Sequence, residues 1–153
     1  MQQINLEQVK VAVVGAGMGI GIAQLAAMHG HPTYVFDLDR SKVQSALTAL
    51  EAQLSKRVQN GKMTQQLLES TFANLIVAED IQQLADAGLI IEAIVEKKEV
   101  KQNLFQQLAA ICTEQTIFAS NTSSISITAI ASAIPNPERV IGLHFFNPAP
   151  VMK

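Results

Sequence analysis

The chain has 153 residues, 48% of them hydrophobic, which is enough for one domain with a sizeable core. Its 11 basic and 13 acidic residues leave a formal charge of -2, so the composition gives no electrostatic reason to expect binding to nucleic acid or to an anionic membrane. The single cysteine, Cys112, excludes an internal disulfide and a cysteine-rich zinc cluster. It lies in a helical pattern, which favours a small core residue over a reactive thiol, and we expect a reducing, cytoplasmic setting and no metal site.

The first elements are a strand and a helix joined by glycines. The segment Val11–Met28 carries no charged side chain and is long enough to mimic a membrane span. Its β-branched run changes midway to helical spacing, and glycines stand at the change. The segment therefore predicts a strand, a turn and a helix rather than a membrane anchor.

Short apolar runs alternate with longer amphipathic runs along the rest of the chain. Strands are predicted at Val9–Val14, Thr33–Phe36, Leu75–Ala78, Leu89–Val95, Thr116–Ser120 and Arg139–Phe146. Helices are predicted at Met18–Gly30, Arg40–Asn60, Thr64–Phe72, Lys97–Thr113 and Ser126–Ala133. Strands such as LIIEAIV are apolar on both faces, which is typical of a parallel sheet covered on each side. The sequence predicts a Rossmann-type doubly wound α/β fold, with a mostly parallel sheet and helices on both faces, in one domain of residues 1–153.

The glycine segment VVGAGMGIGIA does not contain the dinucleotide fingerprint GxGxxG in any frame. Counted from Gly15 the sixth residue is Ile20, and counted from Gly17 it is Ile22. The glycines nevertheless follow a predicted strand and open a predicted helix, whose N–H groups and dipole can hold a pyrophosphate. The wider pattern GxGxxxG fits Gly15, Gly17 and Gly21. We predict a cofactor-binding turn made of Gly15, Ala16, Gly17, Met18 and Gly19; close helix-to-strand packing without a ligand is the alternative.

An acidic residue ends the second predicted strand. Asp37 lies 22 residues after Gly15, near the spacing of about 20 expected for the acid that binds the adenosine ribose hydroxyls. A carboxylate there favours NAD, because it repels a 2′-phosphate. A solvated strand end is the alternative for Asp37, and Asp39 is open to either interpretation.

Later segments carry more specific information. EAIVEKKEVKQNLF (residues 92–105), FASNTSS (118–124) and VIGLHFFNPAPVMK (140–153) follow the dinucleotide turn in that order. Together with GIAQLAAMHGH they closely resemble the amino-terminal domain of the L-3-hydroxyacyl-CoA dehydrogenase family. The resemblance covers nearly the whole chain, and HFFNP is its most specific part.

The resemblance implies oxidation of a 3-hydroxyacyl-CoA thioester to the 3-ketoacyl-CoA, with hydride transfer to NAD. It implies that His144 is the general base, a role that suits a neutral imidazole near physiological pH. It also implies that Ser123 hydrogen-bonds the substrate oxygen beside the nicotinamide and that Asn147 orders the same site. By the same match, Glu96 and Lys101 lie near the ribose and nicotinamide end of the cofactor.

Each of these residues also has a structural alternative. His144 can be a hydrogen-bonded residue at a strand end, and Ser123 can cap the helix that follows. The charges around Glu96 and Lys101 fit an ordinary helix start. His29 and His31 flank Gly30 at a helix end, where we expect them to act as caps without a chemical role.

Two departures from the family qualify the expected function. The usual turn, GAGxMGxGIA, has one more residue than GAGMGIGIA, and a deletion would rotate the helix by about 100 degrees unless the turn tightens or the helix starts later. We therefore expect weaker NAD binding. The chain also stops at Lys153, before the glutamate that pairs with the histidine and the helical domain that makes the dimer in the family. We accordingly expect a nearly inactive fragment of a homodimeric enzyme.

Other functions stay open at this stage. One is a non-catalytic cofactor-binding or structural module of the same fold, and another is a dehydrogenase for a different hydroxy acid. Basic residues at the end of the second helix could meet a phosphate of CoA, although they also fit a solvated helix face: Lys56, Arg57 and Lys62.

Overall fold

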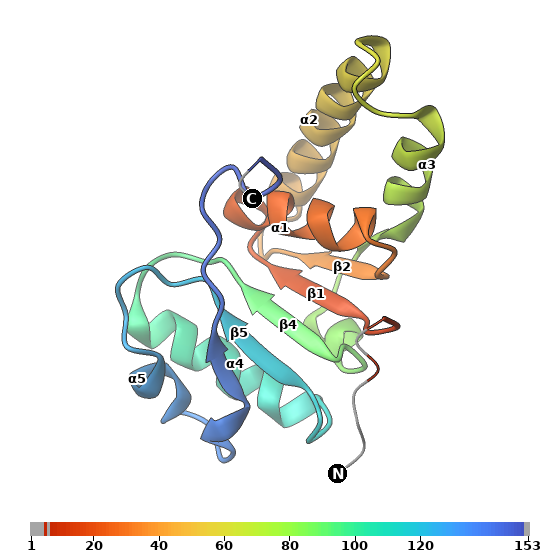
Figure 1. Cartoon of the computed structure of the whole chain (residues 1–153). Coiled ribbons are helices and arrows are strands. Elements are labelled where there is room, and N and C mark those ends of the chain that lie inside the picture. Colours follow the sequence, from red (N-terminus) through yellow and green to blue (C-terminus); the bar gives the residue numbers. More distant parts are fainter. Residues whose placement is uncertain (1–4, 6, 152–153) are drawn as a thin grey trace.

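The computed structural model of the chain describes Asn5 and residues 7–151, and its centre is a parallel sheet (Figure 1). Within these residues, six strands pair in the order β3-β2-β1-β4-β5-β6. The strands are β1 (Val11–Val14), β2 (Thr33–Phe36), β3 (Leu75–Val77), β4 (Leu89–Glu92), β5 (Ile117–Ser120) and β6 (Val140–Gly142). This is the strand order of the doubly wound dinucleotide-binding fold, so the predicted fold class is confirmed.

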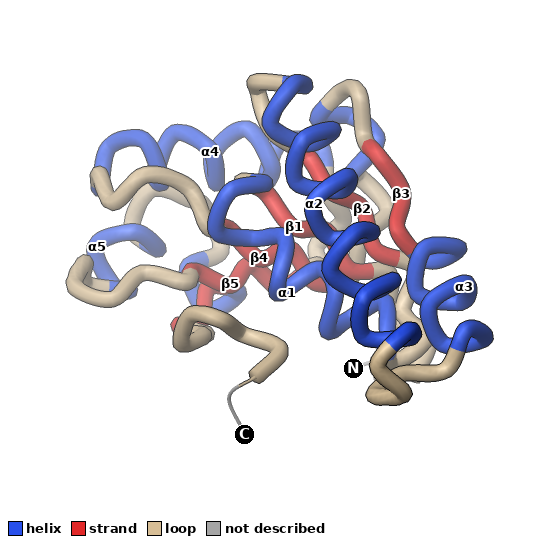
Figure 2. Tube along the Cα trace, turned by 90° about the horizontal axis from the view of Figure 1, so that it is seen from above, coloured by secondary structure: helices blue, strands red, loops and turns tan. Residues whose placement is uncertain are grey.

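Helices cover both faces of this sheet, and Figure 2 shows α1 and α4 on opposite sides of the strands. The helices are α1 (Ala16–Met28), α2 (Arg40–Gln59), α3 (Gln65–Asn74), α4 (Lys98–Ile111) and α5 (Ile127–Ala131), with 3₁₀ turns η1 (Ile81–Leu84) and η2 (Pro137–Arg139). Helix α1 packs on β1 and β2, and α4 packs beside α5 and η1. Every helix therefore connects parallel strands or extends such a connection.

The buried strands explain why the sheet is covered twice. Alternate residues of β1 face opposite sides, so Val11 and Val13 belong to the apolar cluster under α1, whereas Ala12 and Val14 belong to the cluster under α4 and α5. All four side chains are at most 4% exposed. Burial of both faces favours helical crossovers, and these run right-handed between parallel strands.

The direction of the chain reverses across the sheet between β1 and β4. From β1 the chain builds outward through β2 and β3, and it then returns to build β4, β5 and β6 on the other side. The carboxyl ends of β1 and β4 consequently diverge into connections on opposite faces. A crevice at this switch point is where ligands bind in open α/β folds.

The segment after β6 differs from the prediction. A strand was predicted to reach Phe146, but β6 ends at Gly142. The physical reason is that the Phe145 N–H donates to the side chain of Asn121 (2.7 Å) instead of extending the ladder. The chain then crosses the sheet beside α1, where Ala149 is buried in the same cluster as the helix.

Helix α2 and helix α3 form a hairpin with its own small apolar cluster, which includes Leu54 and Leu68. Asp39 caps α2, because its carboxylate accepts a hydrogen bond from the Ser41 N–H (3.0 Å). Asp39 thus has a structural role, although it also lines the cavity described below.

Other local predictions are also decided by the structure. Cys112 is half-buried at the end of α4 and packs against the main apolar cluster, as expected for a small core residue. The His29 ring caps α1 through the Leu25 carbonyl, and the His31 N–H donates to the Ala26 carbonyl in the last turn (3.1 Å), while the His31 ring contacts the Val9 carbonyl. Among the described residues, none of the helices combines the length and hydropathy of a membrane span.

Candidate dinucleotide site

The turn between β1 and α1 is one residue long. Gly15 adopts a φ of 104°, and its N–H donates to the Phe36 carbonyl at the end of β2 (2.9 Å). A Cβ at this position would lie 2.4 Å from the carbonyl oxygen of Ala93, just beyond β4. Glycine is therefore required both by the left-handed backbone and by the approach of the neighbouring chain.

The shortened sequence is accommodated by tightening of this turn. Helix α1 starts at Ala16, two residues before the predicted start at Met18. The glycine packed against the strand is Gly19, where a Cβ would lie 2.5 Å from Cγ1 of Val13. Gly21, the last glycine of the GxGxxxG pattern, instead lies beside Pro150, where a Cβ would be 3.2 Å from its Cδ.

The start of α1 presents backbone donors to a cavity. Its first N–H group, from Ala16, donates to Oδ2 of Asp37 (3.0 Å), while Oδ1 of Asp37 accepts from the Asp39 N–H (2.9 Å). The next N–H groups, of Gly17 and Met18, belong to the first helical turn and have no carbonyl acceptor within the helix. Both residues line the cavity, which gives it two backbone donors at the positive end of a helix dipole.

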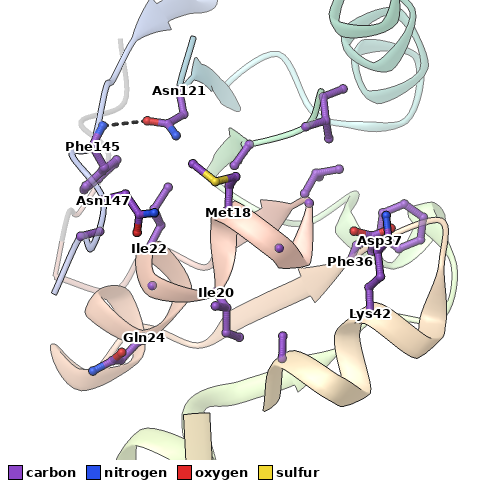
Figure 3. A pocket seen from close by; sticks show the side chains of 18 of the residues that line it. Met18, Ile20, Ile22, Gln24, Phe36, Asp37, Lys42, Asn121, Phe145 and Asn147 are labelled. Carbon is purple, nitrogen blue, oxygen red and sulfur yellow. Dashed lines mark hydrogen bonds between the residues drawn. The ribbon is translucent and has the colours of Figure 1, made fainter. Parts of the chain in front are cut away.

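The cavity has a volume of about 1190 Å³ and lies along the carboxyl edge of the sheet (Figure 3). Asp37, Phe36 and Lys42 stand at one end, and Asn121 and Asn147 stand at the other, with Met18 between them. The volume exceeds that of a typical small-ligand pocket of about 300–1,000 Å³. The lining of the cavity runs from Asp37, at the end of β2, to the loops after β5 and β6.

The predicted site residues lie in three places: in the lining of the cavity, behind the glycine turn, and outside the lining. Lining residues are Gly15, Gly17, Met18, Asp37 and Asn147. Ala16 and Gly19 are buried directly behind the turn. The lining does not include Glu96, Lys101, Ser123 or His144, although it includes their neighbours Val95, Asn121 and Phe145.

Glu96 and Ser123 are hydrogen-bonded to each other at the edge of the cavity. Oε2 of Glu96 accepts from the Ser123 N–H and from its hydroxyl, both at 3.1 Å, and Oε1 accepts from the Thr122 hydroxyl (2.7 Å). Desolvation of Glu96 raises its pKa, but the hydrogen bonds from Thr122 and Ser123 and the charge of Lys101 outweigh it and lower the pKa to about 2. Glu96 is consequently an anion that holds the loop after β5 in place.

This low pKa predicts an acid-dependent contribution to stability. A carboxylate with a pKa of about 2 in the folded chain, against about 4.3 when unfolded, stabilises the fold above pH 4.3 and loses this contribution as the pH falls toward 2. Because the Glu96 side chain is 40% exposed, we expect about 1 kcal/mol after allowance for solvent screening.

The measurement is urea unfolding between pH 2 and pH 6. Glu96→Gln should be less stable than wild type at pH 6, and the difference should shrink toward pH 2. Glu51→Gln, an exposed carboxylate on α2, is the control for removal of one surface charge. A Glu96→Gln deficit that stays constant down to pH 2 contradicts the prediction.

Lys101 is placed differently from the expectation that it contacts the cofactor. Its side chain is 2% exposed, and Nζ lies 2.8 Å from both carboxylate oxygens of Glu92, which is itself fully buried. Nζ also lies 3.4 Å from Oε1 of Glu96. In this structure Lys101 thus holds Glu96, and a direct contact with the cofactor stays a prediction.

His144 stands in the loop after β6, next to the backbone of Asn121. Its Nδ1 lies 3.0 Å from the backbone carbonyl of Asn121, and its ring makes an edge contact with Phe146. A carbonyl oxygen can only accept, so Nδ1 carries the proton and Nε2 of the neutral ring is left as an acceptor. No carboxylate of the described residues forms an ion pair with this ring.

The sequence reasoning missed Asn121 and Glu92. Asn121 binds both His144 and the Phe145 N–H, so it connects the loops after β5 and β6. A polar residue directly after a buried strand was the signal for Asn121, and a lone acid inside the apolar run LIIEAIV was the signal for Glu92.

Comparison with known protein families shows which family the chain belongs to. The family model described as the 3-hydroxyacyl-CoA dehydrogenase NAD-binding domain matches residues 10–153. The chain belongs to this family. A 3-hydroxyadipyl-CoA dehydrogenase of Escherichia coli is 54% identical over 144 residues, which are 94% of this chain and 30% of that protein. A 3-hydroxybutyryl-CoA dehydrogenase of Bradyrhizobium diazoefficiens is 41% identical over 94% of this chain and 50% of its own length.

Solved structures give the same result. The crystal structure of a 3-hydroxybutyryl-CoA dehydrogenase from Escherichia coli matches with a TM-score of 0.93 and 53% identity, over 95% of this chain and 31% of that one. The chain thus spans about 30–50% of the length of these relatives. What it shares with them is the cofactor domain of an NAD-dependent dehydrogenase.

The residues of this chain fit the NAD of its family. A Cβ at Gly17 would meet nothing within 4 Å, so there is free space directly beside the first helical turn. Asp37 accepts from the Ala16 N–H (3.0 Å), so a carboxylate of the kind that binds ribose hydroxyls lies next to the first-turn N–H groups of Gly17 and Met18. Among the described residues, no group of three or more His, Cys, Asp or Glu side chains is placed to hold a metal ion.

Proposed function

We propose that the chain is the NAD-binding domain of a cytoplasmic, homodimeric dehydrogenase that oxidises a 3-hydroxyacyl-CoA to the 3-ketoacyl-CoA. The observation that carries the proposal is the position of His144, with its Nε2 free, beside the Asn147 end of a cavity whose other end holds Asp37. A base beside one end of the cavity and a carboxylate at the other end suit a nicotinamide dinucleotide.

His144 acts as the general base in this proposal. The Asn121 carbonyl keeps the proton on Nδ1, so Nε2 accepts the proton of the substrate hydroxyl. Bound NAD supplies the acceptor for the hydride that leaves the same carbon. In the reverse direction the imidazolium returns its proton to the ketone oxygen.

Ser123 and Asn147 orient the substrate in the same proposal. The Ser123 hydroxyl donates to Glu96, which leaves its oxygen free to accept a hydrogen bond. Asn147 lines the cavity at the end nearer the loop after β6, where its side-chain amide can hydrogen-bond the substrate. Glu96 holds Ser123 through two hydrogen bonds, so its carboxylate supports the contact of Ser123 with the substrate without touching the substrate itself.

The tight turn is the reason to propose weak NAD binding. Because α1 starts immediately after Gly15 and the Ala16 N–H is bound to Asp37, two first-turn donors are left for the pyrophosphate. We also propose that CoA lies along α2. Arg57 lines the cavity there, whereas Lys56 and Lys62 are exposed and outside the lining.

The proposal is tested by adding NADH and then acetoacetyl-CoA to the 153-residue chain. NADH fluorescence should change saturably on binding. Turnover should be very slow, because no described carboxylate stabilises the imidazolium of His144. His144→Ala should remove the residual turnover without changing the NADH affinity.

Three other outcomes decide against parts of the proposal. Absence of NADH binding at millimolar concentration favours a non-catalytic module of this fold, which the shortened turn makes the second candidate. Fast, sustained NADH oxidation contradicts the proposed inactivity of these residues alone. Turnover of other hydroxy acids in preference to CoA thioesters contradicts the substrate class.

A further inference from the structure

A buried acid and base lie directly beneath the candidate site. Glu92, the last residue of the central strand β4, is 0% exposed, and Lys101, in the first turns of α4, is 2% exposed. Ion pairs of this kind lose their hydration on folding, and apolar residues of similar size often give a fold at least as stable. Stability alone therefore gives little reason for this pair, and its other contacts are informative.

These contacts lead to both loops at the site. Oε2 of Glu92 accepts from the Ile94 N–H (3.1 Å), at the start of the loop that carries Glu96. Oε1 of Glu92 accepts from the hydroxyl of Ser120, the last residue of β5. The Ser120 oxygen in turn accepts from the Thr122 N–H (3.2 Å), at the start of the loop that carries Ser123.

One carboxylate thus connects the ends of two neighbouring strands. Beyond it, the two loops meet again where Thr122 and Ser123 donate to Glu96. Nζ of Lys101 connects the two carboxylates, because it lies 2.8 Å from Glu92 and 3.4 Å from Glu96. Every buried side-chain nitrogen and oxygen of the described residues has a hydrogen-bond partner, so the network leaves no buried polar atom unpaired.

We propose that Glu92 and Ser120 are positioning residues, which fix the loops after β4 and β5 so that Glu96 and Ser123 meet the cofactor in one arrangement. The proposal rests on the proposed function of the site. Neither residue lines the cavity, so each acts through the loops it holds. The network preorganises the site before the cofactor binds, which reduces the entropy lost on binding.

The principal test is Ser120→Ala, which keeps both buried charges. Loss of the two hydrogen bonds of the Ser120 hydroxyl, one to Glu92 and one from the Thr122 N–H, should weaken NADH binding about 3- to 10-fold. The pKa of Glu96, read from its carboxyl carbon by NMR, should rise above about 2, because the hydrogen bonds from Thr122 and Ser123 that lower it are made less often. Glu92→Gln should also weaken NADH binding, because the amide cannot accept from Lys101, Ser120 and Ile94 together.

The matched control is Thr116→Val. Thr116 is buried just before the other end of β5, where its hydroxyl donates to the Ala87 carbonyl (2.8 Å), far from the site along the strand. This variant loses a buried hydrogen bond as Ser120→Ala does, so it reproduces any general loss of stability. It should change neither the NADH affinity nor the pKa of Glu96.

The outcomes separate this inference from the proposed function. If wild type does not bind NADH, the proposed function fails, and the NMR titration still decides the positioning role. A Ser120→Ala variant with wild-type NADH affinity and a Glu96 pKa of about 2 overturns the inference. Equal effects of Ser120→Ala and Thr116→Val also overturn it, because they show a structural role only. If Glu92→Gln fails to fold, Ser120→Ala decides.

Discussion

Asp37→Ala should weaken NADH binding by about 10- to 100-fold, the effect expected when a charged acceptor of two ribose hydroxyls is removed. In the structure this carboxylate lines the cavity and accepts from the first N–H of α1 (3.0 Å). Its loss therefore removes the ribose acceptor and the anion at the positive end of the helix together. NADPH should be affected less than NADH, since the carboxylate that repels a 2′-phosphate is gone.

The measurement is a fluorescence titration of NADH and NADPH, with circular dichroism to show that the variant is folded. Asp80→Ala is the matched control, because Asp80 also caps a helical turn, η1, through a backbone N–H but lies outside the cavity. It should leave both affinities unchanged. Unaltered NADH binding by Asp37→Ala would mean that the cofactor does not use the end of β2.

Gly15→Ala should have the largest effect on stability, about 3 kcal/mol or more. A methyl group there would lie 2.4 Å from a backbone oxygen that cannot move without displacing the chain after β4, and the φ of 104° disfavours any side chain. Folded domains of this size are stable by about 5–15 kcal/mol, so the loss is a large fraction of the total.

Urea unfolding followed by circular dichroism measures this effect. Gly17→Ala is the control two residues away: its Cβ meets nothing within 4 Å and it lies in a helix, where alanine is preferred to glycine. That variant should be as stable as wild type or more stable by up to about 1 kcal/mol. A Gly15→Ala chain as stable as wild type contradicts the tight turn described for residues 14–16.

The sequence alone predicted the fold well because the information lies in local patterns. Apolar strands without a polar face exclude a sheet exposed to solvent, and they alternate with amphipathic helices, so the order of elements from β1 to β6 was predicted from these runs. The resemblance in HFFNP and the neighbouring motifs led to the same family that the comparisons show. These conclusions depend only on residue types and their spacing along the chain, which the sequence gives directly.

The site was predicted less completely, since its residues meet through contacts that spacing does not reveal. The ion pair of Lys101 with Glu92 was not predicted, and a contact of Lys101 with the cofactor stays a prediction. The strand expected to reach Phe146 ends early because the Phe145 N–H donates to the Asn121 side chain. For the glycine turn, comparison with the family pattern showed that one residue is missing, but it did not show that α1 starts at Ala16.

The sequence by itself determined that the chain is a doubly wound α/β domain with an acid after its second strand and a histidine after its sixth. Only the tertiary structure decided how the shortened turn closes, which glycine packs on β1 and how Glu92 connects the two loops of the site. The physical reason is that these features depend on atoms brought within hydrogen-bond or van der Waals distance by the sheet, from residues that lie far apart in the chain.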